Sequence, residues 1–154
     1  MLQDPTARWR TIVNSASLVP PYVKAHTTGR WAEIIFRALS SRDANRWQFI
    51  SFRGAKQGEW RGVVDVLAIR KNTEQPTGEV LKRGDLFDII LVQIKGGSAP
   101  SPSKQDRMRL REVGKRYRAK AIVLFEWRKG VWSNFYRLDR KLEWVQTDGK
   151  ALFG

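Results

Sequence analysis

Four polar residues, Asp65, Asp88, Gln93 and Lys95, lie in two otherwise apolar stretches of the chain. Asp65 stands within Gly62–Ile69, among valines and leucine, and Gln93 and Lys95 end the stretch 87–95. Both stretches are expected to be strands. Successive side chains of a strand point to opposite faces, so Gln93 and Lys95 project from the same face. A buried polar group without a partner costs roughly 1–3 kcal/mol, so these groups are expected to have partners.

If the two strands are neighbours, a carboxylate, an amide oxygen and an ammonium group converge on one spot. Oxygen atoms are the ligands that Mg²⁺ prefers, and a fixed positive charge stabilises the charge that develops on a phosphate under attack. Asp65, Gln93 and Lys95 therefore predict a metal-dependent phosphodiesterase.

The same residues resemble a known family, the PD-(D/E)xK nuclease superfamily. Its pattern is an Asp on one strand, then an acidic residue or Gln, one further residue and Lys on the next, and Val64-Asp65 and Gln93-Ile94-Lys95 are similar to it. Gly29–Glu33 resembles the Gly-x-x-x-Glu of Holliday junction resolvases. The chain departs from the pattern at Val64, where the family name has Pro, and at Gln93, where Asp or Glu is usual. Virus-type replication-repair members are similar in carrying Gln there.

This resemblance, over roughly residues 28 to 127, implies a restriction endonuclease-like α-β-β-β-α-β core that hydrolyses DNA with Mg²⁺, or Mn²⁺ as the alternative. It implies that Asp65, Gln93, the carbonyl of Ile94 and a helix glutamate hold the metal. Lys95 would orient the attacking water or stabilise the phosphate. The resemblance also places Gln105, at the start of the second helix, in the catalytic site, although an ordinary polar helix residue is the alternative.

The first expected helix spans residues 30–41 and follows an extended arm, residues 1–27, which Pro20-Pro21 interrupts. Helical spacing predicts a buried stripe on this helix that consists of Trp31, Ile34, Ile35, Ala38 and Leu39. Glu33 is the helix glutamate that the resemblance assigns to the metal. It lies roughly opposite the stripe, so a solvated glutamate is the alternative.

Alternating strands and one further helix follow along the chain. We expect strands at 47–52, at Asp65, at 87–95 and at 121–125, with a long exposed loop over 71–84. The second helix is expected to begin after the N-cap Ser103 and to end near Tyr117, with Leu110, Val113, Gly114 and Tyr117 facing inward. A terminal hairpin is expected over 132–147. The order predicts a single α/β domain over residues 28–154, with a mixed central sheet and a C-terminal β-hairpin.

The charge of the chain predicts a polyanionic partner. Lys and Arg number 29 against 15 Asp and Glu, a net charge of +14, which favours nucleic acid over an anionic membrane. The basic residues of the second helix and its exit are expected to contact DNA phosphates, although a solvated helix face is the alternative. They are Lys104, Arg107, Arg109, Arg111, Lys115, Arg116 and Arg118.

The remaining composition concerns the compartment and the alternatives. The chain has no cysteine, which excludes disulfides and thiolate metal sites and fits a reducing compartment. It starts without the pattern of a secretory signal, and its apolar runs are shorter than a membrane helix. A cytoplasmic DNA nuclease is therefore predicted, with homodimer formation left open. The alternatives are a non-catalytic basic DNA- or RNA-binding protein on the same fold, and a basic structural protein in which Asp65 and Lys95 do not meet.

Overall fold

The structure, a computed structural model, describes residues 21–43, 46–52, 62–128 and 133–154. Within these residues three helices and a six-stranded mixed sheet confirm the α/β class. The elements in chain order are α2 (Pro21–Asp43), β1 (Gln48–Ser51), β2 (Val66–Lys71), β3 (Phe87–Gly96), α3 (Lys104–Arg116), β4 (Ala121–Trp127), β5 (Asn134–Leu138), β6 (Trp144–Thr147) and α4 (Gly149–Phe153).

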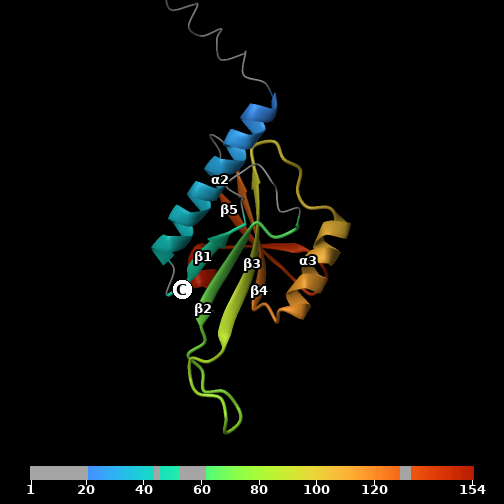
Figure 1. The fold of residues 1–154 in the computed structure, drawn as a ribbon. Helices are drawn as coiled ribbons and strands as arrows, with labels where there is room; N and C mark the ends of the chain where they lie inside the picture. The colour runs from blue at the N-terminus through green and yellow to red at the C-terminus, as the bar shows by residue number, and fades with distance from the viewer. Residues whose placement is uncertain (1–20, 44–45, 53–61, 129–132) are drawn as a thin grey trace, which may run out of the picture.

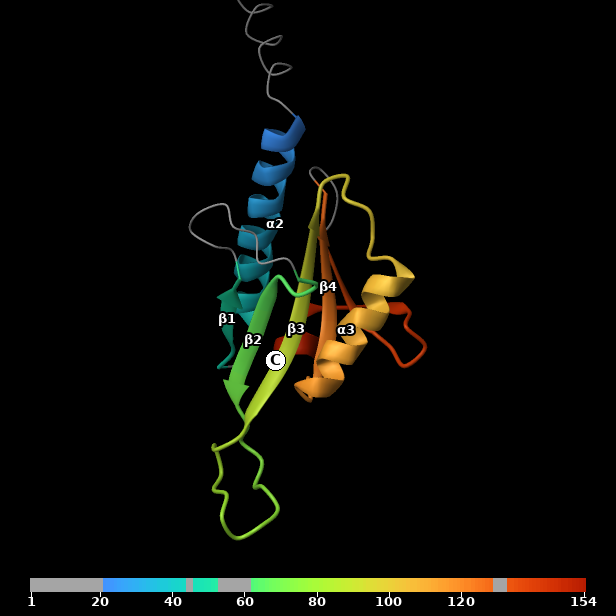
Figure 2. The same ribbon diagram turned by 45° about the vertical axis from the view of Figure 1, so that its right-hand side comes forward.

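The strands follow one another across the sheet in chain order, β1 to β6. Neighbours are antiparallel except β3 and β4, which are parallel and are joined through α3 (Figures 1 and 2). Parallel neighbours require such a crossover connection. The predicted order of helix, three strands, helix and strand is therefore found, and the predicted C-terminal hairpin is β5 with β6. The short helix α4 was not expected.

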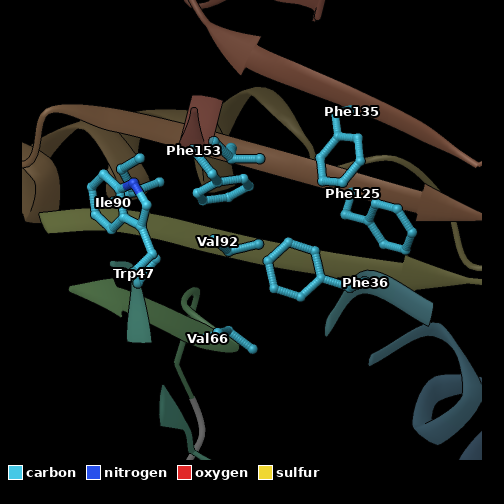
Figure 3. Close-up of a cluster of buried hydrophobic side chains, with 10 residues drawn as sticks. Phe36, Trp47, Val66, Ile90, Val92, Phe125, Phe135 and Phe153 are labelled. Atoms are coloured by element: carbon cyan, nitrogen blue, oxygen red, sulfur yellow. The ribbon is translucent and has the colours of Figure 1, made fainter. Parts of the chain in front are cut away.

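Helices cover the two faces of the sheet differently. Phe36 of α2 and Phe153 of α4 pack on Ile90 and Val92 of β3, within an aromatic core on one face (Figure 3). Helix α3 lies on the opposite face (Figure 2). There a Cβ at Gly114 would stand 2.8 Å from Ile122 Cδ1, so the absence of a side chain lets the helix approach β4 closely.

Helix α2 corrects two expectations. It begins at Pro21, so residues 21–27, expected in the arm, are helical; residues 1–20 lie outside the described residues. A proline fits the first turn of a helix, where its missing N–H needs no partner. The buried positions are Ala32, Phe36 and Ser40, whereas Trp31 and Ile34 are 52% and 45% exposed. The predicted stripe was partly wrong: Ile35 and Leu39 pack against the core as expected, whereas Ala38 is exposed as well. Phe36, which the stripe omitted, packs between the other phenylalanines.

Helix α3 follows its prediction more closely. Ser103 is the N-cap, and its hydroxyl accepts the Asp106 N–H at 3.1 Å while the Asp106 carboxylate accepts the Ser103 N–H, also at 3.1 Å. Leu110 and Gly114 are buried as expected. Tyr117 was expected to face inward but is 64% exposed, because it is the C-cap, where the helix stops following its apolar stripe.

Phe36 is the aromatic side chain on which the core is centred, and its removal is expected to destabilise the fold. Its ring is fully buried and lies 5.5 Å from Phe125 and 5.6 Å from Phe49, centroid to centroid. Phe36→Ala should lower the free energy of unfolding by about 3–5 kcal/mol, through lost burial and the cavity left behind. Denaturant titration measures this. Val80→Ala, at an 88% exposed site, is the control, and an equal loss in both variants would contradict the assignment.

Candidate active site

The carboxylate of Asp65 is fixed to the backbone of β3. Asp65 stands just before β2, whose pairing with β3 starts at Val66 opposite Val92. The Asp65 N–H donates to the Val92 carbonyl at 2.9 Å, and the Ile94 N–H donates to Asp65 Oδ2 at 2.7 Å. The carboxylate thus accepts the hydrogen bond that a further strand carbonyl would otherwise accept. The Asp65 side chain therefore lies at the backbone of Ile94, between Gln93 and Lys95 of the neighbouring strand β3.

Gln93 is a buried polar residue whose side-chain oxygen lacks a partner. Its side chain is 7% exposed, and Oε1 accepts no hydrogen bond from any residue that the structure describes. Alternation along β3 places Gln93 on the face of α3, because Val92 belongs to the aromatic core of the other face. A buried oxygen without a donor costs roughly 1–3 kcal/mol, which a bound ligand would offset.

The backbone of Ile94 adds a further oxygen on the side of Asp65. The Ile94 N–H leaves β3 toward Asp65, and the N–H and C=O of one strand residue point to the same side. The Ile94 carbonyl therefore leaves the strand in the direction of Asp65. Carboxylate, amide and carbonyl oxygens are all ligands that hard cations accept.

Lys95 shares the face of Gln93, because the two residues are two positions apart on β3. Its charge contributes to lowering the pKa of Asp106, a shift caused mainly by hydrogen bonds from the side chain and backbone of Ser103 and, to a smaller extent, by Arg109. Lys95 therefore lies near the first turn of α3. Gln105 is exposed in that turn, next to Asp106. Lys95 and Gln105 are thus at the same end of the sheet.

Glu126 is a residue that the sequence reasoning missed. It neighbours Lys95 in the parallel register of β3 and β4, as Leu124 neighbours Gln93. Residues opposite each other in a sheet share a face, so Glu126 adds a carboxylate beside Lys95. Its Oε1 accepts the hydroxyl of Ser101 at 2.7 Å. Only the strand register carries the signal, since Glu126 stands in the sequence as one acid after an apolar run.

Glu33 lies on the edge of the buried face of α2, and the expectation that it stands opposite that face was wrong. Its side chain is 12% exposed, and Arg37 Nε lies 3.3 Å from its Oε1. The Arg37 Nη1 also donates to the Phe49 carbonyl of β1 at 3.1 Å. The wrong orientation followed from the omission of Phe36 from the stripe, because Glu33 lies three positions before this buried residue and therefore on the same side of the helix.

Asp88 lies five residues before Gln93 on β3 and therefore projects from the other face of the sheet, and its contacts agree. Its carboxylate binds Arg70 Nε at 3.1 Å and Asn72 at 2.9 Å. Arg70 in turn stacks over the Trp47 ring, with 4.5 Å from Cζ to the centroid. Trp47 belongs to the core on the face away from α3, so Asp88 holds Arg70 on that face and not in the candidate site.

The basic residues of α3 do not form one uniform surface. Arg107 and Arg111 turn to the β5–β6 hairpin: Arg107 Nη1 lies 3.8 Å from Glu143 Oε2, and Arg111 donates to the carbonyls of Asp139 and Arg140. Arg109 and Arg116 pair with acids of their own helix, Asp106 and Glu112. Lys104, Lys115 and Arg118 are exposed. Because the side chains of Arg109 and Arg116 are also 57% and 78% exposed, five of the seven basic residues remain open to phosphate.

The metal-ligand set is poor in acids. The described residues contain no cluster of three or more His, Cys, Asp and Glu that could hold a metal ion, so any such site here must use the oxygens of Gln93 and the backbone.

No helix of the described ranges is long and apolar enough to cross a membrane. Comparison of the chain with protein-family models and with curated proteins finds no match.

The stability that the Ser103–Asp106 cap gives to the start of α3 should depend on pH. The folded-state pKa of Asp106 is lowered from 3.8, chiefly by its hydrogen bonds with Ser103. A lowered pKa means that the ionised carboxylate stabilises the fold above the ordinary pKa, and that this contribution is lost as pH falls through the lowered value. Asp106→Asn should therefore melt below wild type at neutral pH, and the two melting temperatures should converge in acid. A gap that stays constant from neutral to acid pH would contradict this.

Proposed function

We propose that this protein is a metal-dependent nuclease that hydrolyses phosphodiester bonds of DNA. The observation that carries the proposal is the hydrogen bond from Ile94 N–H to the Asp65 carboxylate. It joins the two halves of the sequence pattern, Asp65 and Gln93-Ile94-Lys95, which are 28 residues apart at their nearest positions in the sequence. The unsatisfied Gln93 Oε1 beside them supports a ligand at this place.

The fold supports the same proposal. The succession α2, β1, β2, β3, α3, β4, with a parallel β3–β4 pair, agrees with the α-β-β-β-α-β core that the resemblance to PD-(D/E)xK nucleases implies. We therefore propose a restriction endonuclease-like arrangement, to which β5, β6 and α4 are additions at the C-terminal side. Fold alone does not imply activity, so the proposal rests on the residues at the end of β3.

These residues fit a hard divalent cation. Asp65, the amide oxygen of Gln93 and the carbonyl of Ile94 would hold Mg²⁺ or Mn²⁺, and bound DNA would add phosphate oxygens, since Mg²⁺ is normally held by one or two carboxylates together with phosphate and water. When bound, the metal would polarise the phosphate and lower the pKa of an attacking water. Lys95 would hold a positive charge against the phosphate, and the nearby Glu126 carboxylate would keep that ammonium in place.

A second candidate is a non-catalytic nucleic-acid-binding protein on the same fold. The amide at Gln93 and the absence of a three-acid cluster in the described residues favour it. It predicts the same basic surface and the same DNA affinity, but no metal binding at Asp65. Metal binding and cleavage therefore separate the two candidates, whereas DNA binding does not.

Asp65→Asn should abolish most cleavage with little effect on the fold. An asparagine oxygen can still accept the Ile94 N–H, but the negative charge at the metal is lost. We expect the cleavage rate with Mg²⁺ to fall by at least about 100-fold, the scale for loss of one group that stabilises the transition state. DNA affinity should stay the same or rise slightly, because a negative charge near phosphate is removed. Cleavage is measured on linear and branched DNA, and affinity in EDTA.

The matched control is Glu79→Gln, which removes an exposed carboxylate from the β2–β3 loop. It should leave cleavage at the wild-type rate. Wild-type cleavage by an Asp65→Asn protein that melts at the wild-type temperature would overturn the assignment. Absence of cleavage and of metal binding in the wild type would favour the second candidate.

Gln93→Glu should strengthen metal binding to the free protein. A carboxylate in place of the amide adds a negative charge at a 7% exposed position. Without metal this buried carboxyl should have a raised pKa and carry a proton. Calorimetry should show Mn²⁺ affinity higher on the order of tenfold, since ligand charge sets cation affinity. Binding by the variant should also release a proton, which wild type does not do at this position.

Proton release distinguishes the assigned position from a general charge effect. It is measured by repeating the titration in buffers of different ionisation enthalpy. Glu79→Gln should show wild-type values here as well. If Gln93→Glu leaves both metal affinity and proton release unchanged, with and without DNA, Gln93 does not contact the metal.

A further inference from the structure

A basic hollow lies at the end of the sheet opposite to the candidate active site. It has a volume of about 830 Å³ and lies between the C-terminal half of α3, the start of β4 and the β5–β6 hairpin. Ala121 and Ile122 of β4 line it, whereas Gln93 and Lys95 lie beside Leu124 and Glu126, farther along the same strand. The strand rise of about 3.3 Å per residue separates the two places by roughly 7–17 Å.

Charge is the dominant feature of this hollow. Its lining includes six basic residues, Arg111, Lys115, Arg118, Lys120, Arg137 and Arg140, and one acidic residue, Asp139. The Asp139 Oδ1 already accepts the N–H groups of Lys141 and Glu143, and Lys120 pairs with Asp88 at 3.4 Å. Basic residues in the last turn of a helix offset the partial charge of its carbonyls. Here the arginines of β5 and its turn exceed what one helix end requires.

The walls of the hollow are held in place by backbone contacts. The Arg111 guanidinium donates to the Arg140 carbonyl at 2.6 Å and to the Asp139 carbonyl, which fixes the hairpin turn to α3. Arg118, just after the C-cap of α3, has φ 51. Glycine or asparagine is usual at this left-handed position, and other residues strain the backbone. An arginine at this position costs conformational free energy, and such strain is often found at functional sites. The charge of Arg118 is therefore expected to have a function.

We propose that this hollow binds the phosphate backbone of duplex DNA, as an anchor separate from the candidate active site. The choice of DNA rests on the proposed function; the choice of a duplex rests on the lining. No aromatic side chain lines the hollow among the described residues, whereas proteins that bind single strands stack bases on aromatic rings. Arginine and lysine contacts to phosphate need no exposed bases. At 3.4 Å per base pair, a separation of roughly 7–17 Å corresponds to about two to five base pairs, so one duplex can reach both places.

Two arginines in the same strained conformation give a matched test. Arg46 has φ 64 and precedes β1, at the opposite edge of the sheet from the hollow. Arg118→Gly and Arg46→Gly each remove one positive charge and relieve a left-handed backbone. Both variants should melt at or above the wild-type temperature, so that loss of folding cannot explain a loss of affinity.

Binding of a short duplex is measured by fluorescence anisotropy in EDTA, between about 50 and 200 mM salt. For Arg118→Gly, the slope of log affinity against log salt should become shallower by about 0.9, the value for one phosphate contact. Arg118→Gln/Arg140→Gln should reduce the slope by about 1.8. Arg46→Gly should keep the wild-type slope. Equal slopes for Arg118→Gly and Arg46→Gly would overturn the anchor.

Competing ligands test the class of occupant. A single strand of the same sequence should bind more weakly than the duplex and should be less sensitive to the two substitutions at Arg118 and Arg140. Poly-glutamate should not displace the duplex at equal charge. Tighter binding of the single strand, or displacement by poly-glutamate, would overturn the duplex assignment. Because EDTA prevents cleavage, this result is independent of the Asp65→Asn experiment: loss of cleavage there with an unchanged anchor, or the reverse, separates failure of one proposal from failure of the other.

Discussion

Strand β3 is covered on both faces, and the rest of the arrangement depends on this constraint. Its even-numbered residues Ile90 and Val92 pack against the aromatic core under α2 and α4, and its odd-numbered residues Leu91 and Gln93 face α3. A shift of one residue would exchange the two sets and bury charge in the aromatic core. The register that satisfies the core therefore also fixes Gln93 and Lys95 on the face of α3. They lie next to the start of β2, where the Asp65 carboxylate accepts the Ile94 N–H in place of a strand carbonyl.

Local patterns predicted much of the fold. Ser103 and Asp106 predict the start of α3, because both halves of a capping box lie within four residues. The strands are predicted by their apolar composition. The prediction failed where long-range packing decides. Phe36 is buried and Trp31 is exposed because the space above the sheet is shaped by phenylalanines from distant strands, which helical spacing alone does not contain. The five-residue α4 is too short to show a helical period.

The candidate site was predictable in its strand residues and not in its surroundings. Parity along one strand separated Gln93 and Lys95 from Asp88, and the contacts of Asp88 with Arg70 and Asn72 agree. The neighbour of Lys95 on β4, Glu126, depends on the register between parallel strands, which the sequence does not specify by any local turn. The orientation of Glu33 was lost with the wrong face of α2. Arg107 and Arg111 were expected to contact DNA, and their contacts with the hairpin are equally non-local.

Helix α3 runs from one proposed region to the other. Its first turn, with Ser103 and Asp106, lies near Lys95, and its last turn borders the basic hollow through Lys115 and Arg118. The crossover from β3 to β4 forces this placement, because a parallel strand pair requires the chain to return from the end of one strand to the start of the next. Residues at the start of α3 thus lie near the candidate active site, and residues at its end lie at the opposite end of the sheet. A polyanion along this helix would meet basic side chains at both ends, and the carboxylates of Asp65 and Glu126 only at one.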